Sequence, residues 1–251
     1  MKTKLEKNNW TRNFIRIALI VILVSILAVT IISCRGIIVR GSGNVASEDR
    51  DVSGFSKVSV SGSGNLRIEQ GDEESLTIEA EDNILPLITA KVSGNTLKIG
   101  FKPGTSISTT KNIEFHLKVK DLDSISGSGS GNIDCSGLAA DNLSVKTSGS
   151  RNVDMINLEV NSIVLNSSGS GNITMAGITD SQNIKTSGSI KYSGEGLESK
   201  SCVINSSGSG ELIVKVSDDL DINASGSIKI TYIGSPSITQ KTSGSASVNS
   251  K

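Results

Sequence analysis

Apolar and polar residues alternate along most of the second half of the chain. Counted from the central glycine of the Ser-Gly-Ser phrases, apolar residues lie four positions after it and, around Gly149, Gly169, Gly208 and Gly226, also six and four positions before it. Around Gly169, these positions hold Ile163, Leu165 and Ile173. Apolar residues two apart indicate β-strands with one buried face, and the intervening polar residues suit a solvated face. The pattern predicts strand, Gly/Ser corner, strand and second turn, with no helical crossover.

The same pattern returns at a nearly constant interval. The central glycines are separated by 20, 20, 19, 20, 18 and 18 residues, and they are Gly129, Gly149, Gly169, Gly188, Gly208, Gly226 and Gly244. A fixed period of this size is typical of stacked repeats, because one such unit cannot form a core alone. We therefore predict an all-β parallel solenoid with one unit per coil. A flexible Ser-Gly linker is the alternative, but linkers do not keep apolar residues in register.

The corner residues carry their own pattern. Glycine suits corners where a side chain does not fit or where φ must be positive. Asparagine follows three residues after the glycine at Asn132, Asn152 and Asn172, where stacked side chains can bond to one another and to the backbone. The register also predicts which side chains point into the core, namely residues 143, 145, 153, 163, 165, 173, 204, 212, 222 and 230.

The first 33 residues have the form of an export signal. Residues 1–16 are polar and basic, and residues 17–33 are an unbroken apolar run. Ile31-Ile32-Ser33-Cys34 then resembles the bacterial lipobox, in which the cysteine is lipidated and becomes the new N-terminus. We predict a signal peptide over 1–33, lipid attachment at Cys34, and a tether over 34–54. An uncleaved membrane anchor is the alternative. Both place the domain outside the cytoplasmic membrane.

Beyond the tether, the chain resembles a bacterial envelope family. The residues that carry this resemblance are Gly41-Ser42-Gly43-Asn44-Val45, Arg50-Asp51-Val52-Ser53-Gly54-Phe55, Leu66-Arg67-Ile68-Glu69-Gln70-Gly71, residues 76–86 and the later Gly-Ser-Gly-Asn repeats. The family is known as the putative auto-transporter adhesin, head GIN domain family. The resemblance covers roughly residues 41–250 and implies a right-handed parallel β-helix (solenoid) with a lipoprotein or membrane anchor. It supplies no catalytic motif.

The solenoid is expected to have an irregular first part. Residues 55–125 alternate less regularly and are richer in charge, so we interpret them as N-terminal coils and a cap. Residues 126–250 hold the regular coils. We place no domain boundary at 125, because Ser61-Gly62-Ser63-Gly64-Asn65 already carries the repeat phrase. The whole of 55–250 is thus predicted to be one head GIN-like domain.

Charge and aromatic content exclude some function classes. The chain has 25 Lys and Arg against 25 Asp and Glu, so it lacks the basic excess of a nucleic-acid-binding protein. Aromatic residues make up only 3% of the chain, which argues against a base-stacking or sugar-stacking platform. The expected partners are the membrane, through the lipid on Cys34, and an envelope protein or polysaccharide, with no nucleic acid.

The reactive side chains do not assemble a recognisable catalytic or metal site. His116 is the only histidine, and it lies between apolar residues on an expected strand. The acidic cluster Asp72, Glu73, Glu74 lacks the alternating spacing of a calcium loop and is expected to be a solvated turn. No Gly-x-Ser-x-Gly motif follows a strand and opens a helix, as the nucleophile elbow of a serine hydrolase does. We therefore assign no catalytic, metal or cofactor residues.

Two cysteines remain in the exported domain. Cys135 lies six residues after Gly129, and Cys202 lies six residues before Gly208, so both share the parity of the core residues. Their glycines are four coils apart, which is roughly 19 Å at the spacing of paired strands. A disulfide needs Cα atoms within about 7 Å. We predict two unpaired, buried thiols.

Three function classes fit these observations. The chain is predicted to be a non-enzymatic envelope module that presents a polar surface for adhesion, surface interaction or envelope assembly. A β-helix enzyme acting on polysaccharides is the second class, and it requires acidic and basic groups clustered on one face. A membrane-linked sensor or regulatory partner is the third. The outer face of the regular repeats carries mainly Ser, Thr, Asn and Lys, which favours the first class.

Overall fold

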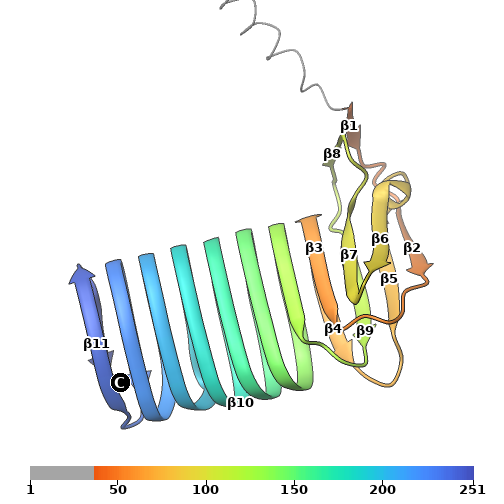
Figure 1. Cartoon of the computed structure of the whole chain (residues 1–251). Coiled ribbons are helices and arrows are strands. Elements are labelled where there is room, and N and C mark those ends of the chain that lie inside the picture. Colours follow the sequence, from red (N-terminus) through yellow and green to blue (C-terminus); the bar gives the residue numbers. More distant parts are fainter. Residues whose placement is uncertain (1–36) are drawn as a thin grey trace, which may run out of the picture. The chain divides into compact units, whose positions relative to one another are not determined.

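The structure, a computed structural model, describes residues 37–251 (Figure 1). Val39–Pro103 and Ile107–Lys251 form one compact unit, which contains the core and the candidate site. A short 3-10 helix, η2 (Leu85–Leu87), separates β5 from β6. The strands are β1 (Ile37–Arg40), β2 (Val45–Arg50), β3 (Lys57–Ser63), β4 (Asn65–Gln70), β5 (Ser75–Glu81), β6 (Ile88–Ser93), β7 (Thr96–Phe101), β8 (Thr105–Ser108), β9 (Glu114–Val119), β10 (Ser124–Ile233), β11 (Ser237–Gly244) and β12 (Ser247–Ser250).

The N-terminal strands combine parallel and antiparallel pairs. β6 and β7 form a hairpin whose turn contains Gly94, which has a φ of 62°. β5 pairs antiparallel to both β2 and β9. In contrast, β3 pairs in parallel with β7, and β4 with β9. β1 and β8 pair with each other in a separate two-stranded sheet. Of the three antiparallel pairs, only β6–β7 is joined by a short turn, while β2–β5 and β5–β9 pair across long connections.

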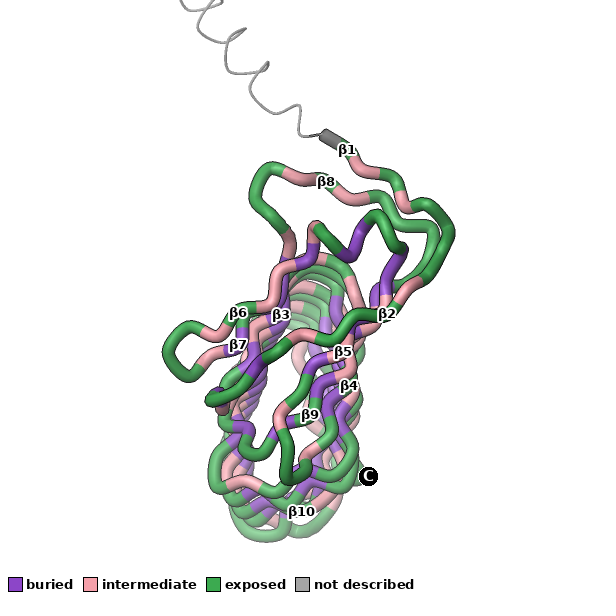
Figure 2. Tube along the Cα trace, turned by 90° about the vertical axis from the view of Figure 1, so that its right-hand side faces the viewer, coloured by how far each residue is buried: buried purple, intermediate pink, exposed green. Residues whose placement is uncertain are grey.

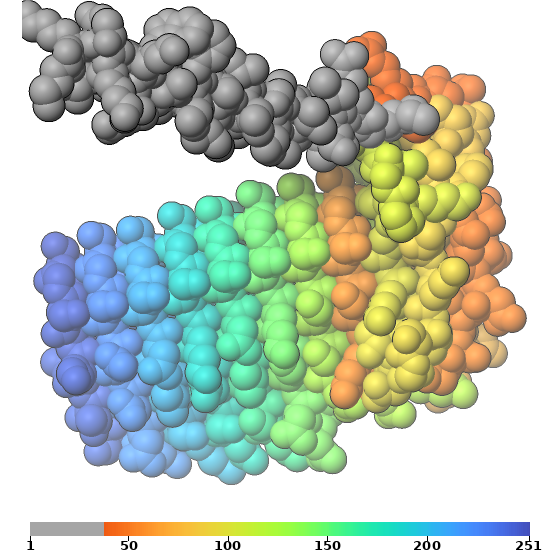
Figure 3. All heavy atoms as spheres, turned by 45° about the horizontal axis from the view of Figure 1, so that its top comes forward, coloured from red at the N-terminus to blue at the C-terminus, as the bar shows by residue number. Residues whose placement is uncertain are grey.

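β10 is a continuous stretch of extended chain that passes round the core several times, and each passage is here called a coil (Figure 1). Its first coil pairs in parallel with β3 and β4, so that Gly129 lies beside Gly62. At its other end β10 pairs in parallel with β11, and Gly226 lies beside Gly244. The glycine corners of neighbouring coils are thus in register, and Figure 3 shows the coils as bands of successive colour lying side by side.

The right-handed parallel β-helix predicted from the sequence is wrong as a description of this fold. The all-β class is confirmed, but the main sheet is mixed, with the strand order β2-β5-β9-β4-β10-β3-β7-β6. Its β2–β5, β5–β9 and β6–β7 pairs are antiparallel, and the sheet curls round the core into a nearly closed, barrel-like wall (Figure 2). The physical reason lies in how the strands meet: the tight turn at Gly94 makes β6 and β7 antiparallel. β5 instead reaches β2 and β9 across long connections, so its direction depends on pairing between distant segments.

The register of the core residues was predicted correctly. All ten side chains expected to point inward are buried, including Ile173 and Leu212, which lie two coils apart in β10. A single hydrophobic cluster extends from Val52 to Ile230, so the N-terminal strands and the coils share one core (Figure 2). Burial of each Leu, Ile or Val side chain contributes about 1.5–3 kcal/mol. The repeated apolar positions therefore hold the coils together.

Candidate binding surface

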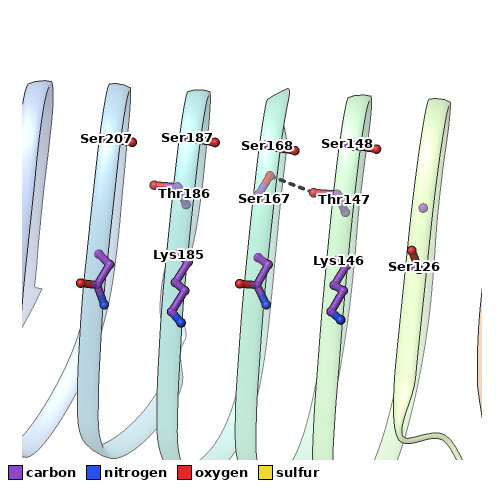
Figure 4. A pocket seen from close by; sticks show the side chains of 13 residues that line it. Ser126, Lys146, Thr147, Ser148, Ser167, Ser168, Lys185, Thr186, Ser187 and Ser207 are labelled. Atoms are coloured by element: carbon purple, nitrogen blue, oxygen red, sulfur yellow. Dashed lines mark hydrogen bonds between the residues drawn. The ribbon is translucent and has the colours of Figure 1, made fainter.

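A polar groove of ≈ 490 Å³ crosses successive coils on the surface of β10 (Figure 4). Each coil contributes a short segment that ends at the glycine corner. Three residues before the glycine stand Lys146, Asn166, Lys185 and Asn205, and one residue before it stand Ser148, Ser168, Ser187 and Ser207. We call this surface the Lys/Asn groove. None of the residues that line it is acidic.

Strand alternation explains why these side chains face outward. In one coil, Val145 is buried, Lys146 is exposed, Thr147 is buried and Ser148 is exposed. Successive side chains of a strand point to opposite faces of the sheet. Because Val145 points into the core, Lys146 must point outward and Thr147 inward. The same alternation recurs in the next coils. The groove is therefore a direct product of the repeat.

Buried hydroxyl groups support the floor of the groove. The Thr147 hydroxyl lies 2.8 Å from that of Ser167 on the next coil, and the Thr186 hydroxyl lies 2.7 Å from that of Ser206. Figure 4 shows the first of these bonds between neighbouring coils. A buried hydroxyl without a partner costs about 1–3 kcal/mol, so pairing across coils makes Thr and Ser acceptable at this inward position. The pairs also hold the backbone of the groove in place.

The glycines form a column beside the groove because the coils approach each other closely there. A Cβ atom added to Gly169 would lie 2.3 Å from the carbonyl oxygen of Gly149, and the φ of Gly169 is 126°. The same contact recurs from Gly129 to Gly244. Both the close approach and the positive φ exclude other residues. The Ser-Gly-Ser phrase thus reflects packing between coils.

Asparagines form a ladder on the far side of the corner, as the sequence predicts. The backbone N–H of Asn132 donates to Oδ1 of Asn65 at 3.0 Å, and the amide of Asn152 donates to Oδ1 of Asn132 at 3.2 Å. The backbone N–H of Asn172 then donates to Oδ1 of Asn152 at 3.0 Å. Each side chain therefore satisfies a group on the neighbouring coil, and this ladder fixes the corner geometry.

Arg151 replaces a glycine of the repeat phrase and is almost fully buried, with 2% of its surface exposed. Its guanidinium donates to the carbonyl oxygens of Gly62 at 2.9 Å, Ser128 at 3.0 Å and Gly64 at 3.3 Å. Burial lowers the pKa of this guanidinium from its ordinary value. The bonds link β10 to the corner between β3 and β4, which is the junction between the coils and the N-terminal strands.

The charges of the groove differ from those elsewhere on β10. Outside the groove, three of the four lysines of β10 pair with carboxylates of other coils, Lys191 being the exception among the described residues. For example, Lys200 lies 2.7 Å from Asp180, and Lys215 lies 2.6 Å from Glu198. Both pairs line a second depression of ≈ 450 Å³, whose charges are therefore balanced. Among residues 37–251, neither Lys146 nor Lys185 has an ion-pair partner. The Lys/Asn groove is consequently a positive surface.

His116 and the acidic turn, the reactive groups that the sequence offers, lie among the N-terminal strands. His116 lies on β9, and its Nε2 is 3.8 Å from a carboxylate oxygen of Glu79. Glu74 belongs to the turn before β5 and accepts a bond from the N–H of Gly54 at 2.8 Å. In the described part of the chain, no group of His, Cys, Asp and Glu gathers in a way that could hold a metal ion. The Cys34 prediction lies outside the described residues.

Both internal cysteines match their prediction. Cys135 and Cys202 are buried and unpaired. Burial raises the pKa of the Cys135 thiol to about 11 and also raises that of Cys202. Their thiols are therefore neutral fillers of the core at physiological pH.

Sequence reasoning missed the Lys/Asn groove. It treated the outer Lys and Asn residues as a general solvated face, because alternation alone does not show which charges find partners. One signal was available: Lys and Asn alternate three residues before the glycine, at Lys146, Asn166, Lys185 and Asn205. For the burial of Arg151, the one signal in the sequence is that an arginine stands where the repeat phrase otherwise has a glycine.

Within residues 37–251, no helix is long and apolar enough to cross a membrane. The apolar run over 17–33 is outside that range. No curated protein matches the chain.

Solved structures of bacterial proteins share the fold. One is a putative adhesin from Bacteroides fragilis, with a TM-score of 0.77 and 24% identity over 84% of this chain and 98% of the other. A second is a putative lipid binding protein from Parabacteroides distasonis, with a TM-score of 0.73 and 23% identity over 86% of this chain and 100% of the other. A third is a putative adhesin from Parabacteroides merdae, with a TM-score of 0.64 and 20% identity over 85% and 99%. The family model for the putative auto-transporter adhesin, head GIN domain, matches residues 54–236, and the chain belongs to this family.

Proposed function

We propose that this chain is a non-enzymatic module of the bacterial cell envelope that presents the polar face of β10 for adhesion, surface interaction or envelope assembly. The observation that carries the proposal is the repetition of the Lys/Asn groove: coil after coil offers an outward serine hydroxyl in register, with lysine and asparagine alternating beside it (Figure 4). A surface that repeats along one direction suits an extended ligand or another surface. The family's adhesin description agrees with this role.

The proposal includes a lipid anchor at Cys34. The support is the sequence Ile31-Ile32-Ser33-Cys34 at the end of the apolar run. Two acyl chains on the cysteine suffice for stable anchoring, whereas one chain is marginal. Such an anchor would hold the groove outside the cytoplasmic membrane, at the end of the tether over 34–54.

Adhesion is tested with whole cells. Cells that carry the full chain should be retained on surfaces coated with envelope polysaccharide or protein more strongly than cells that lack it. Equal retention on every coating would contradict the adhesive role. Release of reducing ends from a polysaccharide by the purified chain would instead support the alternative of a polysaccharide-active enzyme.

The anchor is tested separately. Cys34→Ala should leave the precursor uncleaved, because lipidation precedes cleavage at a lipobox. The measurement is the mass of the protein in membrane fractions. A Cys34→Ala protein that matures normally and appears free in the medium would show that an ordinary signal peptidase cuts the chain.

A further inference from the structure

The Lys/Asn groove contains two positive charges without partners. Lys146 and Lys185 are both exposed, and neither pairs with a carboxylate among residues 37–251. Elsewhere on β10, the similarly exposed Lys229 lies 3.0 Å from Glu211 on the preceding coil. Coil stacking thus readily brings opposite charges together, yet the groove lacks any acidic residue. Its charges are available to an anion from outside.

The two lysines alternate with amides at a regular spacing. Asn166 stands on the coil between them, so Lys146 and Lys185 are two coils apart, or roughly 9.6 Å at the usual strand spacing. A ligand that matches both would carry one negative charge for every two coils. An extended acidic polysaccharide with a carboxylate on every second sugar has about this arrangement. A polyphosphate or nucleic acid is more densely charged and would place anionic groups opposite Asn166 as well.

The remaining groups of the groove suit sugar hydroxyls. Ser148, Ser168 and Ser187 are exposed in a row beside the lysine column (Figure 4). Their hydroxyls bond to no other side chain among the described residues, unlike the buried pair of Thr147 and Ser167. A hydroxyl both donates and accepts, as a sugar hydroxyl does. Asn166 adds an amide with the same double capacity.

We propose that the Lys/Asn groove binds a linear acidic polysaccharide that bears one carboxylate per disaccharide. The glycan lies across the coils, with its carboxylates on Lys146 and Lys185 and its intervening sugar against Asn166 and the serine row. This inference rests on the proposed function and names the class of ligand for it.

The test uses the full chain, purified in detergent, and hyaluronan oligosaccharides, which carry one carboxylate per disaccharide. Binding of a fluorescent oligosaccharide is measured by anisotropy at two salt concentrations. Lys146→Gln and Lys185→Gln should each weaken binding by about two- to fivefold, and the double variant by about tenfold, because each removes an exposed ion pair. Binding should also weaken at higher salt.

Two further variants separate position from charge. Lys146→Asn combined with Asn166→Lys keeps the net charge but places the lysines on adjacent coils, and it should bind about as weakly as the single Lys146→Gln variant, because only Lys185 still meets a carboxylate. Lys229→Gln removes one positive charge outside the groove and should bind like the unchanged chain. A circular dichroism melt of each variant shows that it is folded.

Each other outcome overturns the inference in an identifiable way. If all variants bind hyaluronan equally, the groove is not the site, although the adhesive function stands. If polyphosphate binds more tightly than hyaluronan through the same lysines, the ligand class is wrong. If the chain does not bind hyaluronan but cells carrying it still adhere, only this inference fails; if adhesion is also absent, the proposed function fails with it.

Discussion

The N-terminal strands β2–β9 and the coils of β10 use the same residue types for different physical purposes. Gly94, in the β6–β7 turn, has open space around the position of a Cβ atom and is needed for its φ of 62°. Gly169, in β10, faces the carbonyl oxygen of Gly149 and has no room for a side chain. Glycine is therefore a local requirement in the first region and a requirement of stacking in the second.

Polar groups show the same contrast. In the N-terminal region, carboxylates bind the backbone: the buried Glu81 accepts bonds from the N–H of Gly43 at 2.7 Å and of Thr110 at 3.0 Å. In the coils, hydroxyls and amides bond to the equivalent residue of the next coil, as in the Asn ladder through Asn132 and Asn152. The polar contacts of the N-terminal region are therefore each different, whereas those of the coils repeat the same side-chain bond from one coil to the next.

Core truncation should give the largest effect and should show whether the two regions unfold together. Ile173→Ala in β10 and Ile78→Ala in β5 each remove buried methyl groups, and each should cost about 2–5 kcal/mol. Because both residues belong to one cluster, each variant should lower a single unfolding transition. The corner variant Ser170→Ala is the control and should cost under about 1 kcal/mol. Calorimetry with two separate transitions, or equal shifts for core and corner, would contradict a shared core.

The glycine contrast predicts unequal costs for the same substitution. Gly169→Ala should destabilise the chain by about 3 kcal/mol, because it adds both backbone strain and overlap with the carbonyl of Gly149. Gly94→Ala adds strain alone and should cost about 1–2 kcal/mol. Urea denaturation measures both. Equal costs would mean that neighbouring coils can separate slightly at the glycine column.

The repeat made the buried positions along β10 predictable, whereas the N-terminal region offered no comparable signal for its strand pairing. Alternation around Gly169 gave the buried positions Ile163, Leu165 and Ile173, because strand direction follows from parity alone. The antiparallel pairing of β5 with β9 depends on which distant strands meet, and no local pattern encodes that choice. The groove was only partly predictable. Its outward positions follow from strand parity, but parity does not show that Lys146 lacks an ion-pair partner among the described residues.

The junction between the two regions depends on Arg151. Arg151→Met keeps the volume of the side chain but leaves the carbonyl oxygens of Gly62, Gly64 and Ser128 without their charged donor, and it should cost about 2 kcal/mol. Arg151→Lys is the matched control, because it keeps the charge and loses the planar fork. A methionine variant as stable as the unchanged chain would show that the cost of burying the guanidinium cancels its hydrogen bonds.

Acid should weaken the contacts that Glu81 makes in the N-terminal region. The hydroxyl and backbone N–H of Thr110, together with the N–H of Gly43, lower the pKa of Glu81 from its ordinary value. Because the folded-state pKa is lowered, the stabilisation is present above the unfolded pKa near 4.5 and is lost as pH falls further. Hydrogen exchange at pH 3 to 6 should show opening at Gly43 and Thr110, and Glu81→Gln should remove this pH dependence. Exchange that does not change with pH at these sites would exclude the mechanism.

The two cysteines test which residues lie on which coil, and their expected effect on the folded chain at neutral pH is the smallest of these predictions. Burial keeps the Cys135 thiol protonated, with its pKa raised to about 11, and Cys202 lies in the same core. A thiol reagent should therefore label neither residue in the folded domain at pH 8, and should label both in denaturant without reductant.

Since the folded-state pKa of Cys135 is raised above the ordinary 9.0, its contribution to stability is present below pH 9.0 and is lost as pH rises toward about 11. The matched variant Cys135→Ala should remove that alkaline loss. A native mass lower by about two hydrogens would reveal an intramolecular disulfide, which the roughly 19 Å between their coils forbids; it would overturn the assignment of residues to coils on which the groove depends.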